Sequence, residues 1–373
     1  MSNASTHIIT QDAIAILEQL IAIPSLSKQE DKTAGCILSF LQERNIIVYQ
    51  VLNNIWAVNK YADVSRPSIL LNSHHDTVAP NSAYTNNPFQ SITKEGKLFG
   101  LGSTDAGASL VSLLAAFLFY YDAKDLPYNI VFAASAEEEI SGVNGIQKLF
   151  EEPSFSAWFK HTQSFALVGE PTQTDLAIAE KGLLVLDCVA SGKPGHAARE
   201  EGDNAIYKAI EAIDWFRSFH FEKVSPLLGE TKMSVTVINT INSAHNLVPG
   251  QCSFVVDIRL TELYTHAEIL EIINKNVTVS VTPRSTRIKS SSIPMDHPVV
   301  KAGLALGKNT YGSPTTSDQA LIPLPSLKCG PGFSGQSHSA NEYVLLSDIE
   351  EGIQFYVALL ERLGLKREGQ QKV

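Results

Sequence analysis

The sequence predicts an α/β protein with a central sheet covered by helices and a smaller α+β domain inserted into the chain. In the larger domain, short apolar runs typical of buried strands alternate with segments whose apolar residues recur at helical spacing. Several of these runs end abruptly in histidines or acids. In the inserted domain, residues 178–290 are expected to follow the order strand, helix, strand, strand, helix, strand, which is a split βαββαβ unit.

Length and composition indicate an ordinary globular protein of two domains. A chain of 373 residues exceeds one comfortable hydrophobic core, and 44% hydrophobic with 18% charged residues excludes a disordered chain. We place the larger domain in residues 1–177 and 291–373, and the inserted domain in residues 178–290.

Charge and cysteine usage exclude several classes of protein. The net charge of −10 and the lack of a Lys/Arg cluster argue against nucleic-acid binding, and an acidic balance fits a protein that gathers cations. No run approaches the roughly 18 apolar residues of a membrane span. The four cysteines form no Cys-X-X-Cys pair, so we expect buried free thiols in a reducing cytoplasm and no disulfide framework.

The individual elements follow from apolar periodicity and from turn residues. The expected helices of the larger domain are residues 12–23, a second helix opening at 25–27 and ending at 44–45, then 108–120, 298–306 and 346–363. Its expected strands are residues 46–52, 55–60, 68–72, 128–134, 165–168 and 326–330, with a short strand pair around Gly96. In the inserted domain we expect strands at 182–190, 233–241, 252–260 and 277–281, and helices at 204–216 and 266–273.

The apolar run of residues 69–76 ends in His74, His75 and Asp76, and the chain is organised around it. Buried strands of α/β sheets carry functional sites at their carboxyl ends. Strand alternation places His74 and Asp76 on one side and His75 on the other. His74 can therefore bind a metal while Asp76 orients its ring; an ordinary polar strand end is the alternative.

A glycine-rich stretch at residues 100–107 surrounds Asp105. It lacks the Gly-Lys-Ser/Thr of a phosphate loop and the spacing of a dinucleotide fingerprint, which disfavours nucleotide binding. The glycines instead allow a tight backbone turn that aims Asp105 at one point.

Further acids and a histidine follow other predicted strands. Glu138 and Glu139 come after residues 128–134, Glu170 after 165–168, and His338 after 326–330. Buried carboxylates are costly unless a cation is present, although acids at a solvated helix start are an alternative for the Glu137–Glu139 run.

Oxygen and imidazole ligands suit Zn²⁺, Mn²⁺ or Co²⁺. Five ligands are too many for one catalytic zinc with an open position, but they fit two ions that share a bridging carboxylate. Glu138 would then be free to act as a base. The five expected ligands are His74, Asp105, Glu139, Glu170 and His338.

Taken in order, the motifs of this chain resemble the cocatalytic-zinc aminoacylase and peptidase family, and the resemblance covers nearly the whole chain. That family includes acetylornithine deacetylase, succinyl-diaminopimelate desuccinylase, aminoacylase and carboxypeptidase G. The motifs are Ser73-His74-His75-Asp76-Thr77-Val78, Gly100-Leu101-Gly102-Ser103-Thr104-Asp105, Glu137-Glu138-Glu139 with Gly145, Gly169-Glu170-Pro171-Thr172, Gly195-His196-Ala197-Ala198 with Asn204-Ala205, Asn246-Leu247-Val248-Pro249 with Asp257-Ile258-Arg259, Thr316-Ser317-Asp318, and Gly330-Pro331-Gly332 to His338.

The resemblance implies a zinc-peptidase-like catalytic domain, with a mixed central sheet and helices on both faces. It implies that Asp105 bridges two metal ions, that Glu138 is the general base and that Asp76 buttresses His74. It also implies a cis peptide bond after Asp105. The resemblance divides the remaining ligands between the two ions. His74 and Glu170 would bind one ion, and Glu139 and His338 would bind the other.

For the inserted domain, the resemblance implies a lid that forms a homodimer. His196 would reach across to the partner's active site and stabilise the oxyanion. Asn246 and Arg259 would hold the substrate carboxylate; a loop cap and a salt bridge within the lid are the alternatives.

Two departures from the family concern the substrate pocket. Ala106-Gly107 stands where many relatives have Met-Lys, and residues 80–88 lack the usual tryptophan. The pattern His-His-Asp-Thr-Val, followed by Ser-Ala-Tyr-Thr and Asn-Pro-Phe, is similar to bacterial deacylases of arginine biosynthesis that act on N-acylated ornithine or citrulline.

We therefore expect a zinc-dependent deacylase of N-acetyl or N-succinyl ornithine or citrulline, with Co²⁺ or Mn²⁺ as alternative ions. The alternatives on the same site are a succinyl-diaminopimelate desuccinylase and a di- or tripeptidase. A two-metal phosphatase and a non-catalytic metal-binding protein are alternatives of other classes.

Overall fold

The computed structural model describes residues 3–199 and 201–367, which form two compact units. The first unit comprises residues 1–178, 292–311 and 317–373, and the second comprises residues 179–291 and 312–316. The boundaries that we expected at 177/178 and 290/291 lie next to those of the units. The second unit also includes residues 312–316, which we had assigned to the larger domain.

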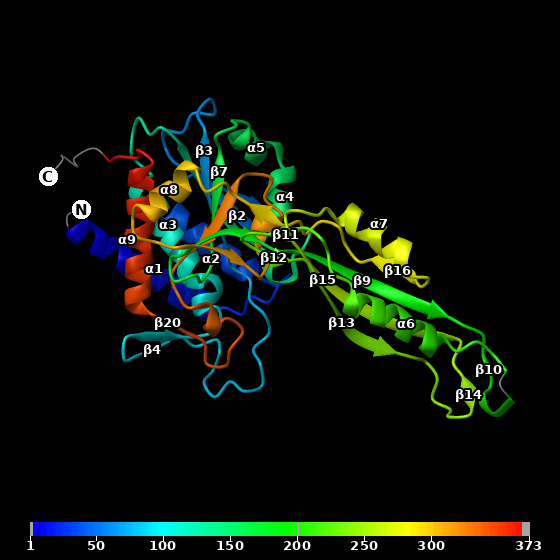
Figure 1. The fold of residues 1–373 in the computed structure, drawn as a ribbon. Helices are drawn as coiled ribbons and strands as arrows, with labels where there is room; N and C mark the ends of the chain where they lie inside the picture. Colours follow the sequence, from blue (N-terminus) through cyan, green and yellow to red (C-terminus); the bar gives the residue numbers. More distant parts are fainter. Residues whose placement is uncertain (1–2, 200, 368–373) are drawn as a thin grey trace. The chain divides into compact units, whose positions relative to one another are not determined.

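The first unit is built on a mixed sheet (Figure 1). Its strand order is β1-β2-β6-β3-β7-β19-β8. The central strands β6, β3, β7 and β19 run parallel, whereas β1, β2 and β8 pair antiparallel to their neighbours. The strands are β1 (Val48–Val51), β2 (Asn54–Val58), β3 (Ser68–His74), β6 (Asn129–Ser135), β7 (Phe165–Gly169), β8 (Leu176–Glu180) and β19 (Ser326–Cys329). The chain passes between the units along β8, β17 (Ser291–Ser292) and β18 (Thr310–Ser313).

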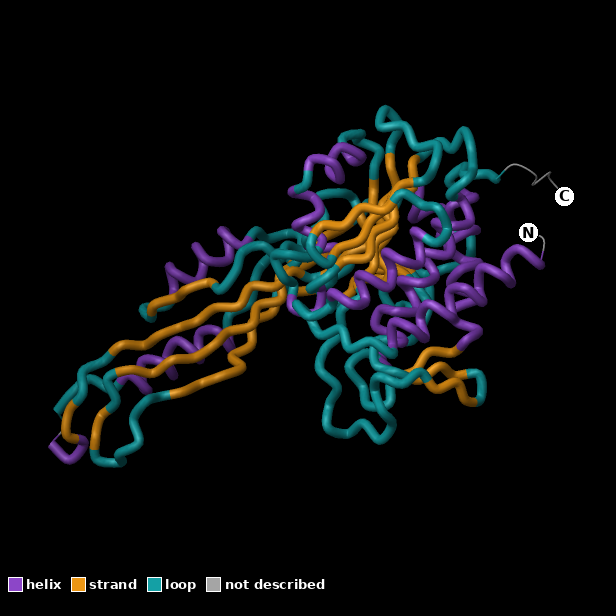
Figure 2. The backbone as a smooth tube through the Cα atoms, turned by 180° about the vertical axis from the view of Figure 1, so that it is seen from behind, coloured by secondary structure: helices purple, strands orange, loops and turns teal. Residues whose placement is uncertain are grey.

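Helices cover both faces of this sheet (Figure 2), as expected. Alternation along β3 places Ile69 and Leu71 in one core and Leu70 in the other. The first core is completed by α1 (Asn3–Ile21), α2 (Asp31–Gln42), α3 (Ser109–Tyr120), α8 (Pro298–Leu304) and α9 (Leu346–Arg362). The second core is completed by α4 (Ile146–Glu151) and α5 (Pro153–Ser156).

The most apolar helical segment of the first unit runs from Ser103 to Tyr120. By length and composition it could cross a membrane, with a mean hydropathy of 1.3, which corrects the expectation that no run approaches that length. However, 89% of it is buried inside the protein, which is typical of a core helix.

The second unit holds a four-stranded antiparallel sheet of order β13-β15-β9-β16, with α6 and α7 packed on its apolar side. Its elements follow the predicted βαββαβ order: β9 (Gly182–Ser191), α6 (Ala205–Ser218), β13 (Lys232–Asn239), β15 (Gln251–Leu260), α7 (His266–Asn276) and β16 (Ser280–Pro283). Asn204 caps α6 by accepting from the N–H of Ile206, and Thr265 forms a capping box with Glu268 at the start of α7.

Short elements complete both units. The first unit also contains a small sheet of β4 (Ile92–Lys94), β5 (Lys97–Phe99) and β20 (Tyr343–Leu345), a π-helical turn η1 (Ser103–Ala108), and the 3₁₀ turns η2 (Glu138–Ile140), η3 (Ala157–Phe159), η5 (Asp318–Ala320) and η6 (Ser334–Gln336). The second unit adds the pair β10 (Gly195–His196) and β14 (Leu247–Val248), the pair β11 (Val224–Ser225) and β12 (Gly229–Glu230), and the turn η4 (Ala197–Arg199).

The N-terminal helices differ from those we expected. The first begins at Asn3 and not at residue 12, and the second begins at Asp31 and not at 25–27. The second difference has a tertiary cause, because Leu26 bridges to Thr77 and the hydroxyl of Ser27 donates to Asp76. The four cysteines are free as expected, but Cys36 is partly exposed and not buried.

Candidate metal centre

The sheet topology brings the predicted ligands to one edge. Because β6, β3 and β7 are adjacent and parallel, their carboxyl ends meet at the same side of the sheet. β3 ends at His74, η2 with Glu139 follows β6, and Glu170 follows β7 directly. β19 lies parallel to β7 and leads into the loop that carries His338.

Two groups of ligand atoms form at this edge and share Asp105. In the first, the Nε2 atom of His74 lies 3.3 Å from Oδ1 of Asp105 and 4.0 Å from Oε1 of Glu170. In the second, the Nε2 atom of His338 lies 3.0 Å from Oε2 of Glu139 and 3.6 Å from Oδ2 of Asp105. Within each group the ligand atoms lie within 4.8 Å of one another. Asp105 therefore presents one carboxylate oxygen to each group, as a bridging ligand must.

The charges at this edge also fit bound cations. Burial, together with neighbouring carboxylates, raises the pKa of Glu138 and of Glu139, and raises the pKa of Glu170 to about 8. Burial lowers the pKa of His74, but the adjacent Glu138, Asp105 and Asp76 override this effect and raise it. Several buried carboxylates close together cost free energy through desolvation and mutual repulsion, and bound positive charge compensates this cost. The five residues thus fit two divalent ions held by oxygen and imidazole.

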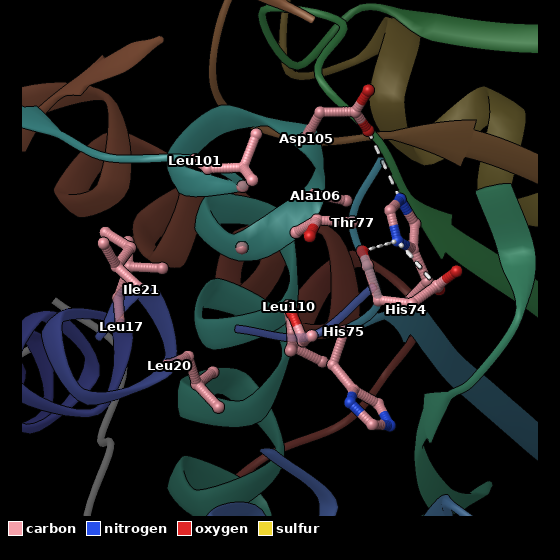
Figure 3. A pocket seen from close by; sticks show the side chains of 14 residues that line it. Leu17, Leu20, Ile21, His74, His75, Thr77, Leu101, Asp105, Ala106 and Leu110 are labelled. Atoms are coloured by element: carbon pink, nitrogen blue, oxygen red, sulfur yellow. Dashed lines mark hydrogen bonds and ion pairs between the residues drawn. The ribbon is translucent and has the colours of Figure 1, made fainter. Parts of the chain in front are cut away.

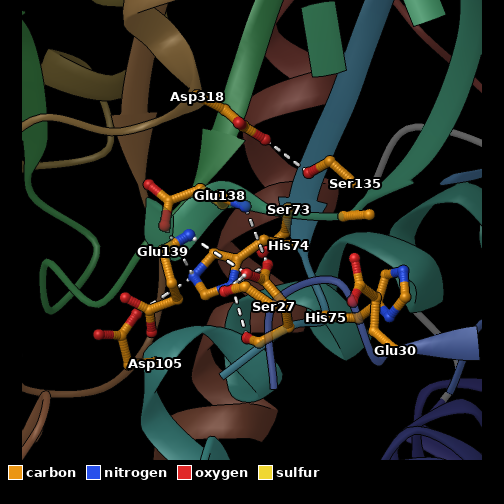
Figure 4. A network of polar contacts seen from close by, with 12 residues as sticks. Ser27, Glu30, Ser73, His74, His75, Asp105, Ser135, Glu138, Glu139 and Asp318 are labelled. Atoms are coloured by element: carbon orange, nitrogen blue, oxygen red, sulfur yellow. Dashed lines mark hydrogen bonds and ion pairs between the residues drawn. The ribbon is translucent and has the colours of Figure 1, made fainter. Parts of the chain in front are cut away.

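Glu138 lies beside the two groups of ligands (Figure 4). Its Oε2 atom is 3.8 Å from Nε2 of His74. Its backbone N–H donates to Oδ1 of Asp76 at 3.0 Å, which holds the turn that carries it. Glu138 can therefore face a reacting water at the ligands without being a member of either group.

Asp76 contacts His74 through its backbone as well as through its carboxylate. The Nδ1 atom of His74 hydrogen-bonds the backbone carbonyl of Asp76 at 3.0 Å, while the nearer carboxylate oxygen lies 3.5 Å away. That carboxylate accepts from Ser27 at 2.6 Å and from the N–H groups of Glu138 and Glu139 at 3.0 and 3.3 Å. The backbone carbonyl thus directs Nε2 of His74 toward the ligands, and the carboxylate positions the base and a ligand.

Asp105 sits in a tightly turned segment. The peptide bond between Asp105 and Ala106 is cis, which confirms that expectation. Gly102 has a φ of +75°, and a Cβ atom there would come within 2.7 Å of the side chain of Thr77. Only glycine fits such a position without strain.

Three polar residues that the sequence did not assign to the site support it. Ser337 donates a hydrogen bond to the carboxylate of Asp105. Glu342 accepts from the N–H groups of the Asp105 turn. Asp318 accepts from Asn72 at 2.8 Å and from Ser135 at 2.5 Å (Figure 4), and its charge helps to raise the pKa of Glu138. Asp318 and Ser337 stand inside motifs that the sequence analysis quotes without giving either residue a role, and Glu342 follows His338 by four residues.

His75 faces away from the ligands, as strand alternation predicted (Figure 3). Its Nδ1 and Nε2 atoms lie 2.9 Å from the hydroxyl of Thr33 and 2.9 Å from the carbonyl of Asn53. Behind His74 and Asp105 lies a cavity of about 20 Å³ with an apolar wall that includes Leu17, Leu20 and Ile21 (Figure 3). That volume suits about one water molecule, so this cavity is not a substrate pocket.

The other three predicted site residues belong to the second unit. His196 and Asn246 are exposed and adjacent, because β10 pairs with β14 and the N–H of Ala197 donates to the carbonyl of Asn246 at 3.0 Å. Arg259 lies near the end of β15, where it forms a bidentate ion pair with Asp257. Its Nε atom donates to Oδ1 at 2.9 Å, and its Nη2 atom donates to Oδ2 at 3.1 Å.

Arg259 lies far along β15 from the strand end that Asn246 precedes. Asn246 precedes β14, which leads into β15 at Gln251, and Arg259 stands eight residues further along that strand. At about 3.3 Å per residue, the strand separates its two ends by about 26 Å.

Comparison with known proteins agrees with this geometry. Residues 70–362 match Peptidase family M20/M25/M40. The succinyl-diaminopimelate desuccinylase of Orientia tsutsugamushi (strain Ikeda) is 24% identical over 378 residues, covering 92% of this chain and 94% of that protein. A probable carboxypeptidase of Paracoccidioides brasiliensis (strain Pb03) is 26% identical over 383 residues, covering 93% and 84%.

Solved structures share the fold. Aminopeptidase PepT from Bacillus cereus superposes with a TM-score of 0.74 at 17% identity, covering 95% of this chain and 99% of that one. The Bacillus subtilis YXEP protein, titled a dinuclear metal binding peptidase from the M20 family, gives a TM-score of 0.67 at 17% identity, covering 96% and 99%. The resemblance seen in the motifs is therefore confirmed, and the chain belongs to Peptidase family M20/M25/M40, the metal-dependent amidohydrolases.

Proposed function

We propose that this enzyme hydrolyses the amide bond of an N-acyl amino acid at two zinc ions. The observation that carries the proposal is the carboxylate of Asp105, which presents one oxygen to each group of ligands with Glu138 alongside. In this assignment His74 and Glu170 hold one ion, Glu139 and His338 hold the other, and Asp105 is shared. Oxygen and imidazole donors favour Zn²⁺, with Co²⁺ and Mn²⁺ as the other ions of matching preference.

The chemistry assigns Glu138 to proton transfer. When bound, two divalent ions lower the pKa of water and polarise the acyl carbonyl. Glu138 takes the proton of the attacking water, and burial, which raises its pKa, lets it retain that proton. It then delivers the proton to the leaving amine as the C–N bond breaks. Asp76 holds the backbone N–H of Glu138 throughout, so the base stays aimed at the ligands.

A loop beside the ligands supports an assignment of the substrate. Asn81 donates to the backbone carbonyl of His338 at 3.1 Å, and the N–H of Thr85 donates to the side chain of Asn341 at 3.1 Å. Residues 80–88 thus lie against the segment of a ligand, and they carry the pattern that resembles deacylases of ornithine and citrulline. We assign the enzyme to N-acetyl or N-succinyl derivatives of these amino acids, acting in the cytoplasm.

A second candidate is N-succinyl-diaminopimelate, since several relatives carry that desuccinylase name. The test is a panel of acetyl and succinyl derivatives of ornithine, citrulline, glutamate and diaminopimelate, together with di- and tripeptides, assayed with Zn²⁺ or Co²⁺. We expect kcat/KM to be highest for an ornithine or citrulline derivative. A preference for succinyl-diaminopimelate or for peptides would overturn this assignment, and hydrolysis of none would favour a non-catalytic metal-binding protein.

We further propose a homodimer formed through the second unit. β13 is an edge strand of its sheet, and an open edge readily pairs with another chain. Apolar side chains are exposed along β13, just after it and on the adjoining α6, which is unusual unless another surface covers them. They are Tyr207, Ile210, Val237, Ile238 and Ile241.

The separation of Arg259 from Asn246 also supports a dimer. Asn246 lies five residues before Gln251, and Arg259 stands about 26 Å along β15 from Gln251, so the two residues of one chain are not placed to bind the same carboxylate. Both can act on the same substrate if Arg259 comes from one chain, with Asn246 and His196 from its partner.

Substituting Ile210→Lys and Ile238→Lys together is expected to produce monomers, because both side chains are exposed and lysine opposes edge pairing. Light scattering coupled to size exclusion measures the mass, and the melting temperature should change little. Val224→Lys, an exposed position of the same unit outside this surface, is the control and should remain dimeric. A monomeric double variant with full activity would contradict action across a dimer.

A further inference from the structure

We propose that Glu342 is a positioning residue that holds the bridging ligand Asp105 in register with His338, and so sets the affinity of the metal pair. This inference rests on the metal-binding role proposed above for Asp105. Neither the motifs nor the relatives assign a role to Glu342.

The carboxylate of Glu342 receives three backbone donors from the segment that carries Asp105. Oε2 accepts from the N–H of Gly102 at 2.8 Å, and Oε1 accepts from the N–H groups of Thr104 and Asp105 at 2.7 and 2.9 Å. The residue is 1% exposed, so water does not compete for these bonds.

The three N–H groups belong to Gly102, which precedes the η1–α3 helical segment, and to Thr104 and Asp105 in its first turn, where the first donors of a helix lack intrahelical acceptors. Gly102 precedes this segment and has no side chain that could cap it. A carboxylate from a distant part of the chain therefore satisfies donors that the local sequence leaves open. Losing the carboxylate of Glu342 would leave these three backbone N–H groups without an acceptor. They lie in the turn that carries Asp105, the residue that has to present one oxygen to each ion.

The same contact ties two ligand-bearing segments together. Glu342 follows His338 by four residues, so the segment that caps the Asp105 turn also carries a ligand of the second group. Two more bonds fix the register: the N–H of Gly100 donates to the carbonyl of Glu342 at 3.0 Å, and the hydroxyl of Thr104 donates to the carbonyl of Tyr343 at 2.6 Å. β20 then pairs with β5, which ends just before Gly100.

Together with the Ser337 hydroxyl, which donates to the carboxylate of Asp105, the side chain of Glu342 thus fixes the placement of Asp105 relative to His338. Because Asp105 belongs to both groups of ligands, loosening it affects both ions, and the group that contains His338 loses the register of two of its ligands. Residues that orient metal ligands typically contribute 10- to 100-fold to metal affinity.

The test is Glu342→Gln, titrated with Zn²⁺ or Co²⁺ alone after the metals have been stripped by a chelator. Glutamine keeps the size of the side chain, but it must turn an NH₂ group toward one of the N–H donors. We expect the dissociation constant of at least one ion to rise about 10- to 100-fold. KM should stay within about two-fold, and excess metal should restore most of kcat, because the reacting groups are unchanged.

Tyr120→Phe is the matched control. It removes another buried hydrogen bond of the same unit, from the Tyr120 hydroxyl to the carbonyl of Val357 at 3.2 Å, and should change the melting temperature without changing metal affinity. If Glu342→Gln does not fold, Thr104→Val removes another bond of the same contact and should raise the dissociation constant several-fold.

The outcomes separate this inference from the proposed function. A folded Glu342→Gln protein that binds two ions as tightly as the wild type overturns the positioning role. A wild-type protein that fails to bind two ions overturns the metal centre itself.

Discussion

Glu138→Gln is expected to keep both metal ions while kcat falls by about 10³-fold, within the range that general acid–base catalysis contributes. Glutamine has nearly the same shape, and the N–H of residue 138 would still donate to Asp76. The amide cannot take the proton of the attacking water or return it to the amine, so the loss should fall on kcat and leave KM nearly unchanged.

Metal analysis and steady-state kinetics on one preparation measure both parts of this expectation. Glu139→Gln provides the contrast, because Glu139 lies 3.0 Å from His338 within a group of ligands, and its loss should weaken metal binding directly. Wild-type turnover in Glu138→Gln would remove Glu138 from the mechanism. Loss of metal from Glu138→Gln would instead make it a ligand.

Rescue between two inactive chains is the second large effect that we expect. His196→Ala should lower kcat by about 10²-fold, the scale of losing one donor to an oxyanion. Glu138→Gln is inactive for a different reason. In a hybrid dimer, the site on the Glu138→Gln chain has both defects, because its partner supplies alanine in place of His196. The site on the His196→Ala chain has an intact Glu138 and receives an intact His196 from the partner. Co-expression in equal amounts should therefore restore about a quarter of the wild-type sites, since half of the dimers of a two-fold assembly would be hybrids.

Differently tagged chains allow the hybrid dimer to be purified, and its activity is compared with that of each parent dimer. His220→Ala is the control, because His220 is another exposed histidine of the second unit and should retain full activity on its own. A hybrid no more active than its parents would show that His196 acts within its own chain or not at all.

Part of the candidate site was predictable from the sequence because two of its ligands stand directly at strand ends, whereas His338 comes nine residues after β19. His74 ends β3 and Glu170 follows β7, so their positions depend only on the strands being parallel neighbours. Asp105 was predictable from its glycines, and His75 could be set aside because side chains alternate along a strand.

The contacts that position the ligands were not predictable in the same way. The carboxylate of Asp76 binds the backbone of Glu138 and Glu139, 62 and 63 residues away in the chain. Glu342 binds the N–H of Asp105 across 237 residues. No local pattern encodes such a pairing, because it exists only once β20 has joined β5 and the strands of the sheet have aligned.

By itself, the sequence determined the α/β class, the inserted βαββαβ unit and the identity of the residues that gather at the strand ends, because apolar periodicity and turn chemistry act over a few residues. Only the tertiary structure decided that the carboxylate of Asp76 bonds the backbone of Glu138 and Glu139, that the backbone carbonyl of Asp76 hydrogen-bonds the ring of His74, and that Arg259 stands far along β15 from the strand end that Asn246 precedes. The physical reason is that distances of 3 to 4 Å between side chains depend on strand order, register and turn geometry, which the whole chain sets together.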